Sequence, residues 1–472
     1  MAFEQITNLK SYKKINADSS VQTTQTKLVV ENLKTILSAS STAIVTRLEY
    51  ESDKVIAAAQ QKINLLYIDN ENAIKSIEKN NEFSFSLSSN GATNFFVDLK
   101  ERETTIEQLQ NGELVATSVF IAEACAVSAF NFSAVTPKNE NVFEKTKTIK
   151  TQNLSATCQD KFAVSYEGEI TASSILASEA KCCLTSVTAT EDAIVVDGQL
   201  FVSVISEIDG NIKQSNKKID FSGEAVALGL KKDDIVDANA QVENLVVTLS
   251  NTGANATIAI NATIGIIAEC YSENSTEVIE DAFMENNELL ITSQGVEINK
   301  ISKNKFAIQE KECILQSKDK NANIGAILAV INPKCENGLL TCTVLYRQAE
   351  TDEIASCIMF AAVEDINSNS KIAITSFSKK RAKELLIEFV ALNSENDQSS
   401  TYEVFASAIE TGCENEKDNK AIVVYSAKKG QCLFDIAKYL KANPAIIKEQ
   451  NENLEDILSA DRKILLYKSA KI

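Results

Sequence analysis

Residues 421–440 read AIVVYSAKKGQCLFDIAKYL, and this stretch sets the order of the elements at the end of the chain. The β-branched and aromatic run 422–426 predicts a strand, and the polar segment 427–431 predicts a tight turn after it. Apolar residues then recur at i, i+3, i+4 and i+7, which indicates a helix with one buried face. These residues are Leu433, Ile436, Ala437 and Leu440.

Two more elements complete this segment. Asn443 suits the position that caps a helix and Pro444 suits its first turn, so a second short helix is expected through Asn451. The apolar run 463–467 predicts a closing strand. Residues 421–472 are therefore expected to form a small module with the order strand, helix, helix, strand.

The charge of the chain restricts its partners. The net charge is −18, which argues against nucleic acid, because phosphate binding needs clustered Lys and Arg. Residues 421–472 carry nine basic and six acidic residues, whereas the other 420 residues carry 38 basic and 59 acidic ones. An acidic body thus precedes a mildly basic module.

Other features of the composition bear on the compartment. The 472 residues have room for three or four domains. No run approaches eighteen apolar residues, so membrane insertion is not expected. The first residues lack the basic and apolar regions of a secretory signal, so a cytoplasmic protein is expected.

The side chains needed for most catalytic sites are missing. The chain has no histidine, which removes Ser-His-Asp and Cys-His nucleophiles and His-containing zinc sites. Its eleven cysteines lack the paired spacing of a Cys-only zinc site, and no glycine-rich nucleotide motif is present. We expect no catalytic residue, no metal and no cofactor. Reduced, buried thiols are expected at Cys125, Cys270, Cys342 and Cys357.

Before residue 410 the hydrophobic pattern has mostly period two, which indicates strands. Asp209-Gly210-Asn211 and Glu336-Asn337-Gly338 predict turns between them, and two segments, 105–109 and 379–386, are interpreted as short helices. Similar sequences recur: KLVV, KFAV and KFAI begin at residues 27, 161 and 305. In addition, residues 53–84 align without gaps on residues 191–222.

These observations predict a mainly β protein. Its expected parts are three tandem β-sandwich or barrel-like repeats of about 140 residues, a polar linker and the small C-terminal βααβ module. The predicted bounds are 1–142, 143–280 and 281–410 for the repeats, 411–420 for the linker and 421–472 for the module.

Two family resemblances follow from these residues. The first unit contains an apolar residue and Tyr67, a polar turn, Ile74-Lys75 and then Phe83-Ser84, which resembles the SPOCS domain of spore-coat-associated proteins. The C-terminal module resembles LysM modules, and the combination is similar to proteins that hold the basal coat layer on the developing spore. The positions that match LysM are Val424-Tyr425, Lys429-Gly430, Leu433, Ile436-Ala437, Asn451 and Ile464–Leu466.

The LysM resemblance implies a glycan groove between two loops, 429–433 and 453–461, for N-acetylglucosamine-containing glycans such as peptidoglycan. The family often has Gly-Asp-Ser/Thr-Leu in the first loop, where this chain has Gly430-Gln431-Cys432-Leu433. Cys is a weaker donor than a hydroxyl, and Gln lacks the capping carboxylate. The family's Pro-Gly before the last strand is here Ala460-Asp461.

The same resemblance implies a second use of the module. Related proteins dock through it on the coat-morphogenetic ATPase, stage IV sporulation protein A, at the forespore surface. An aromatic anchor beside Ile422 and a basic turn would suit such an interface. The candidate binding residues for groove or docking face are Ile422, Lys429, Gly430, Gln431, Cys432, Leu433, Phe434, Asn453, Leu454 and Ile457.

The preferred interpretation is a non-enzymatic scaffold of the mother-cell cytoplasm, located at the forespore surface or spore coat. Its implied partners are a stage IV sporulation protein A-like protein and other coat proteins. One alternative is a cell-wall protein that binds peptidoglycan glycan. A second is a carbohydrate-active enzyme in the β domains, which would require paired carboxylates in a cleft. Glu123 and Glu269, which recur at one repeat position, are the acidic residues of interest.

Overall fold

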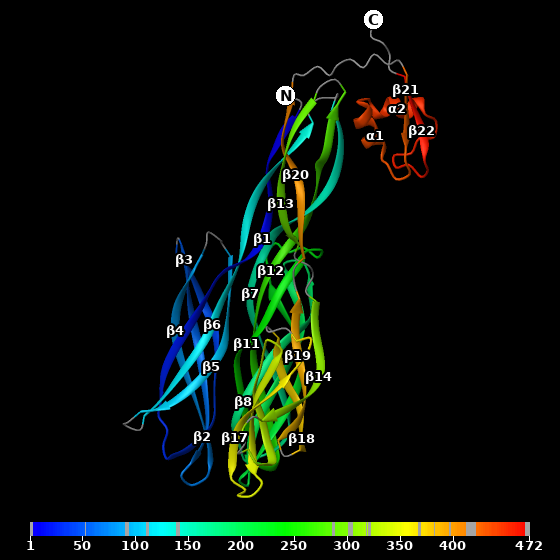
Figure 1. Ribbon diagram of the computed structural model, residues 1–472. Coiled ribbons are helices and arrows are strands. Elements are labelled where there is room, and N and C mark those ends of the chain that lie inside the picture. The colour runs from blue at the N-terminus through cyan, green and yellow to red at the C-terminus, as the bar shows by residue number, and fades with distance from the viewer. Residues whose placement is uncertain are drawn as a thin grey trace.

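A computed structural model describes residues 3–51, 53–89, 94–109, 113–137, 142–285, 288–300, 305–317, 319, 322–366, 370–381, 383–395, 398–411 and 422–467. It is mainly β, as the sequence predicts, with two short helices near the C-terminus. Most of the strands gather at one end of the molecule, long strands extend from it, and the C-terminal module lies beside their far end (Figure 1).

The first group of strands forms two three-stranded sheets that face each other. Their orders are β1-β6-β5 and β2-β3-β4, and contacts of β2 with β5 and of β1 with β4 join their edges. The strands are β1 (Phe3–Leu28), β2 (Leu33–Tyr50), β3 (Lys54–Asp69), β4 (Ile74–Ser88), β5 (Asn94–Gln108) and β6 (Leu114–Pro137).

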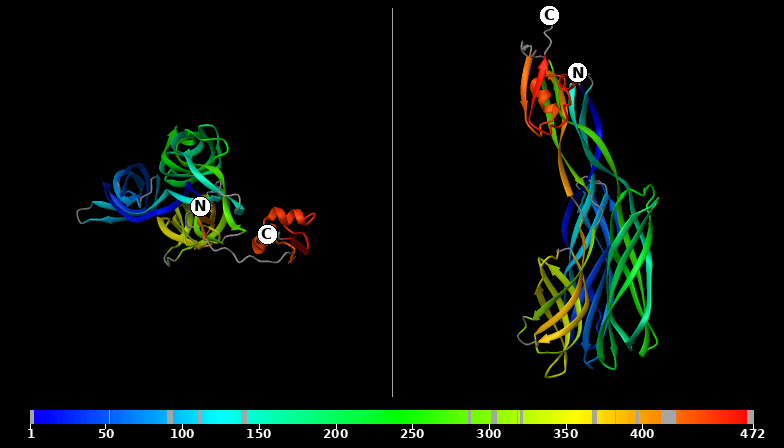
Figure 2. Two further views of the ribbon diagram at one scale, coloured as in Figure 1. Left: turned by 90° about the horizontal axis from the view of Figure 1, so that it is seen from above. Right: turned by 90° about the vertical axis from the view of Figure 1, so that its right-hand side faces the viewer.

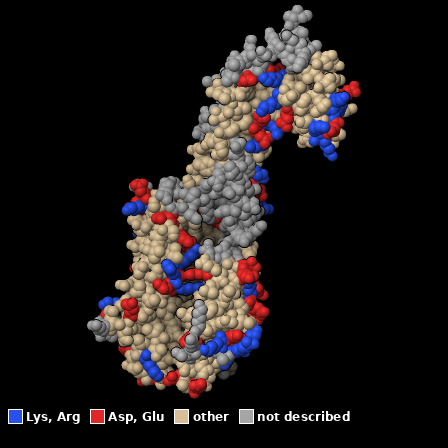
Figure 3. All heavy atoms as spheres, in the orientation of Figure 1, with Lys and Arg blue, Asp and Glu red and all other residues tan. Residues whose placement is uncertain are grey.

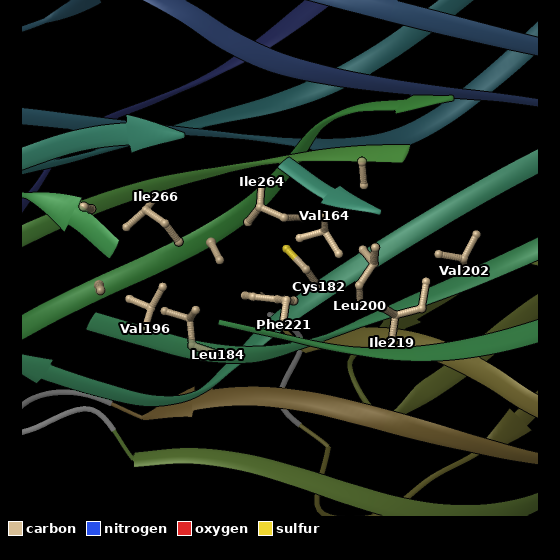
Figure 4. Packing of buried hydrophobic residues seen from close by; sticks show 14 of the residues in the cluster. Val164, Cys182, Leu184, Val196, Leu200, Val202, Ile219, Phe221, Ile264 and Ile266 are labelled. Atoms are coloured by element: carbon tan, nitrogen blue, oxygen red, sulfur yellow. The ribbon is translucent and has the colours of Figure 1, made fainter. Parts of the chain in front are cut away.

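The second group repeats this arrangement, with the orders β11-β12-β7 and β10-β9-β8. Alternate residues of both sheets point inward, as Val196, Leu200 and Val202 do on β9, and pack against Ile264 and Ile266 of β12 (Figure 4). The strands are β7 (Val142–Ala172), β8 (Ser174–Ala189), β9 (Ala193–Ile208), β10 (Asn211–Val226), β11 (Ile235–Ser250) and β12 (Gly253–Met284).

The third group forms one six-stranded sheet, β15-β16-β17-β14-β19-β18, whose end strands β15 and β18 contact each other, so the sheet is a nearly closed barrel. A separate pair, β13 with β20, precedes and follows it. The strands are β13 (Glu288–Lys300), β14 (Lys305–Ser317), β15 (Ile324–Glu336), β16 (Leu339–Gln348), β17 (Ile354–Ala362), β18 (Lys371–Arg381), β19 (Glu384–Glu395) and β20 (Gln398–Thr411).

The two turns predicted from Asn, Asp and Gly are confirmed. Asp209 and Gly210 have positive φ angles of 49° and 74° between β9 and β10, and Asn337 and Gly338 have 50° and 75° between β15 and β16. Two consecutive positive φ angles match the twist of a tight hairpin.

We call the three strand groups barrels, because in each of them the edge strands contact one another. Three two-stranded ribbons extend beyond the barrels as a stalk: β1 with β6, β7 with β12, and β13 with β20. They pack together through small apolar clusters, one of which joins Phe132 of β6, Ile149 of β7 and Val296 of β13. Seen along the stalk, the blue, green and yellow strand groups lie side by side around it (Figure 2).

An apolar cluster, which we call the hub, joins the three barrels. It contains Leu66 of β3, Ile205 of β9 and Leu345 of β16, with Leu37, Ile212 and Leu328 around them. Polar contacts reinforce it, because the Gln214 side-chain oxygen accepts from the Val330 backbone N–H at 2.7 Å and its Nε2 donates to the Val330 carbonyl at 3.1 Å. One amide thus satisfies both backbone groups of a strand from another barrel.

The C-terminal module has the predicted order, β21 (Ile422–Ala427), α1 (Leu433–Leu440), α2 (Pro444–Gln450) and β22 (Arg462–Tyr467). The four apolar residues predicted to face inward on α1 are buried. The predicted cap is also confirmed, since the Asn443 side chain accepts from the Ala445 N–H at 2.8 Å. Neither helix is long and apolar enough to cross a membrane, and this finding covers the described residues.

Several local predictions were wrong. Residues 105–108 belong to β5, because they pair with β6, and residues 379–381 and 384–386 belong to the paired strands β18 and β19. Pairing with a neighbouring strand overrode the local helical spacing in both places. Cys270, Cys342 and Cys357 are buried as predicted, whereas Cys125 is only half-buried. The predicted boundary after residue 280 falls inside β12, which runs to Met284.

The hub makes a testable prediction. Leu345→Ala should lower the free energy of unfolding by about 2–5 kcal/mol, because a fully buried leucine leaves a cavity. Leu339→Ala on the same strand is the control, since Leu339 is 43% exposed. Urea unfolding followed by circular dichroism measures both. Equal midpoints for the two variants would show that the hub does not hold the barrels together.

Candidate functional site

Backbone hydrogen bonds hold the two loops of the predicted glycan groove together. The Gly430 N–H donates to the Leu458 carbonyl at 2.8 Å, the Leu458 N–H to the Gln431 carbonyl at 3.0 Å, and the Leu433 N–H to the Asp456 carbonyl at 2.8 Å. Gly430 has a φ of 87°, which explains the glycine at this turn. These backbone donors are therefore already used within the protein.

Other polar side chains brace the first loop. Asp461 accepts from the Lys429 N–H at 2.9 Å and from Lys428 Nζ at 3.2 Å, and the Gln431 side chain accepts from the Lys428 N–H at 2.8 Å. These bonds lower the pKa of Asp461, the Lys429 N–H contributing most. The residues that depart from the LysM pattern thus stabilise the turn in another way.

The candidate residues of the two loops have different roles. Leu433 and Leu454 lie in the core of the module, whereas Asn453 is exposed and Ile457 is 66% exposed. A β-bridge joins Cys432 to Ile457. Burial raises the pKa of the Cys432 thiol, as does its hydrogen bond to Asp435. The structure therefore brings the loops together but leaves few of the candidate side chains free for a ligand.

One end of the outer face of the β21–β22 sheet is apolar, and we call this part the sheet face. It consists of Ile422, Val424, Leu465 and Tyr467, which are 37–58% exposed. Ile422 pairs with Tyr467 and Val424 with Leu465, so the four side chains form a contiguous square. Of these four residues, only Ile422 is predicted from the sequence as a binding residue. Their signal is the pair of runs IVVY and ILLY, which are apolar at every position and therefore apolar on both faces.

Phe434 lies on a different surface from Ile422. Its ring lies 5.3 Å from the ring of Phe283, centroid to centroid and edge-on, and Phe283 belongs to β12 of the stalk. Val423 and Tyr425 pack in the same cluster as Phe434, so the alternation of β21 directs Ile422 away from it. The residue proposed as an exposed anchor is thus in contact with the body of the protein.

The recurrent acidic residues Glu123 and Glu269 line one cavity of about 670 Å³ between the barrels. Each faces an aspartate across its strand pair, Asp98 opposite Glu123 and Asp237 opposite Glu269. Lys100 Nζ donates to Glu123 at 2.5 Å, and the Tyr271 hydroxyl donates to Glu269 at 2.8 Å. Each of the two carboxylates therefore already has a hydrogen-bond donor within the protein.

Metal binding has no geometric support in the described part of the chain. There, no three His, Cys, Asp or Glu side chains lie together in a way that could hold a metal ion. The cysteines around the cavity include Cys182 and Cys183, and burial raises the pKa of both thiols, that of Cys183 to about 11. Protonated thiols are poor nucleophiles and poor metal ligands.

The fold and these surfaces define a multi-barrel β protein with a small module that presents an apolar sheet face. Residues 171–250 match the family model described as SipL, SPOCS domain. This range covers β8, β9, β10 and β11 in full, so the match falls on the second barrel, whereas the residues that carry the resemblance in the sequence lie mainly in the first. The match supports a SPOCS-domain protein, and this family suggests a role related to sporulation. No curated protein and no solved structure matches the chain.

The Asp461 brace predicts a pH dependence. A carboxylate whose folded-state pKa is lowered stabilises the fold above its unfolded pKa, and this contribution disappears as the pH falls through the folded value. We therefore expect the Lys429 amide resonance to shift only below the usual titration range of Asp. NMR titration measures this shift, and in Asp461→Asn the low-pH step should vanish. A step that persists in the variant would assign it to another group.

Proposed function

We propose that the protein is a non-enzymatic scaffold in spore-coat assembly. In this proposal three tandem SPOCS-like barrels form the body, and a LysM-like module localises it by docking on a coat-morphogenetic protein at the forespore surface. The proposed partners are a stage IV sporulation protein A-like protein and further coat proteins. The family match in the second barrel and the exposed sheet face of the module support this function.

The hub supports the tandem-repeat part of the proposal. Three sets of three residues occupy corresponding positions in the barrels, and all nine residues belong to this one cluster. Members of a set lie on corresponding strands, such as the second strand of each barrel. The sets are Leu37, Leu176 and Leu328; Leu66, Ile205 and Leu345; and Ile74, Ile212 and Ile354.

The sheet face is the observation that carries the docking proposal. A contiguous exposed apolar patch on a small module is typical of a protein interface, because water favours its burial. Aromatic residues such as Tyr467 often dominate the binding energy of such a patch. Glycan binding through the loops is less well supported, since the Gly430 and Leu433 N–H groups already have partners.

A pull-down with purified stage IV sporulation protein A tests the proposal. The full chain should bind, and the double variant Val424→Ala/Tyr467→Ala should bind at least about tenfold more weakly, because two of the four side chains of the patch are truncated. Ile446→Ala is the control: Ile446 is also apolar and 41% exposed, but it lies on α2. Circular dichroism checks the fold of each variant.

A parallel sedimentation with insoluble peptidoglycan separates the two binding functions. Binding to the protein but not to peptidoglycan supports the scaffold. Retention on peptidoglycan without binding to sporulation protein A would refute the docking function and favour a glycan-binding cell-wall protein.

A further inference from the structure

One end of the β7–β12 ribbon contacts the first helix of the module. We call the residues Phe143, Lys145, Glu280, Asp281 and Phe283 the ribbon end. The register of β7 and β12 places Phe143 directly opposite Phe283, with ring centroids 5.2 Å apart. This aromatic pair is joined to the apolar core of the module in a single cluster.

The contact has an aromatic centre and charged flanks. Phe283 is 6% exposed and meets the edge of Phe434. Beside it, Lys438 Nζ donates to both carboxylate oxygens of Asp281 at 2.6 Å, and Lys441 lies 3.6 Å from Glu288. The charges are complementary in both directions: Lys438 and Lys441 of the module face carboxylates of the β strands, and Lys145 of β7 lies in the field of Asp435 on α1.

A local irregularity of β12 directs these side chains toward the module. The pairing with β7 shifts register between Ile279 and Asp281, so Glu280 is an extra residue in the strand. Such a bulge re-aims the side chains that follow it. Glu280 forms an ion pair with Lys145 at 3.1 Å, while Asp281 and Phe283 are the residues that meet the helix.

We propose that the α1 surface around Phe434, Lys438 and Lys441 is a docking site for an acidic β-strand that carries an aromatic side chain, and that the ribbon end occupies this site as an intramolecular latch. The inference rests on the proposed function in one respect, because it assumes that the partner uses this surface in addition to the sheet face. The ribbon end, together with Glu288 of β13, shows the chemistry that fits: a phenylalanine flanked by carboxylates. A partner with the same features has to displace it.

The latch is suited to reversible opening. Its ion pairs are partly exposed, with 42% and 30% of the side chains of Lys438 and Asp281 accessible, and such pairs contribute little each. An edge-on aromatic pair adds a modest further stabilisation. A partner that binds the open form therefore sees an apparent affinity lowered by the fraction of molecules that are open.

Hydroxyl-radical footprinting of the full chain tests the latch without any partner, because oxidation of the Phe434 ring reports its exposure. Asp281→Lys and Lys438→Asp should each raise Phe434 oxidation, and the double swap Asp281→Lys/Lys438→Asp should restore the wild-type value. Phe283→Ala should shift the opening equilibrium by about three- to tenfold, as expected for an aromatic pair. Glu273→Lys is the matched control, since it reverses a charge on β12 that pairs with Lys150 of β7.

Binding of sporulation protein A to the same variants gives the second readout. An open latch should tighten binding by up to roughly tenfold relative to wild type. Equal oxidation of Phe434 in all variants would show that the surface is already open in the wild-type protein. If the single variants raise oxidation and the double swap does not restore the wild-type value, the charge complementarity is refuted. Opening without tighter binding would refute regulation by the latch. If no form binds sporulation protein A, the proposed function fails, while footprinting still decides whether the surface is covered.

Discussion

The antiparallel pairing of β7 with β12 is the interaction on which the rest of the structure depends. It runs from Ala172 opposite Gly253 to Val142 opposite Met284, so one pair of strands serves two environments. At one end it closes the second barrel, where alternate residues such as Ile260 and Ile264 fill the core. At the other end it projects as a ribbon and reaches the module. The two ends are therefore connected by one antiparallel ladder, which is interrupted by three shifts of register.

Burial of apolar side chains joins the barrels to one another, as it also stabilises each barrel. The hub is apolar, so its contribution comes from surface removed from water. Polar groups around it are matched: Lys334 of β15 lies 3.0 Å from Glu101 of β5, whose side chain is only 13% exposed. An unpaired carboxylate at that depth would destabilise the fold, which makes the pairing of barrels specific as well as favourable. The acidic surface elsewhere is interspersed with basic side chains (Figure 3).

Local sequence patterns predicted those elements whose conformation depends on neighbouring residues in the chain. Period-two alternation predicted the strands, the Asp-Gly and Asn-Gly pairs predicted hairpins, and the 433–440 spacing predicted α1. The gap-free alignment of residues 53–84 with 191–222 hides a difference in one hairpin. In the hub, Leu66 and Ile205 are 139 residues apart, whereas Ile74 and Ile212 are 138 apart, so the intervening turns differ by one residue. A slip of one residue reverses the facing of a strand, which pairing and burial reveal but sequence spacing alone does not.

The candidate site was harder to predict because it depends on contacts between distant segments. The position of Phe434 in the sequence indicated an aromatic on a surface, and nothing near it indicated that Phe283, some 150 residues earlier, would cover it. Conversely, the sheet face follows from strand alternation once both runs are seen to pair. The α1 surface and the sheet face differ in whether another part of the chain covers them. Within the chain, the α1 surface already has an aromatic and an acidic neighbour. The side chains of the sheet face are exposed, so the described part of the chain leaves this face open. Under the proposed function, the open face recruits a partner first, and a partner that also reaches α1 then competes with the ribbon end for a surface that the chain itself already covers.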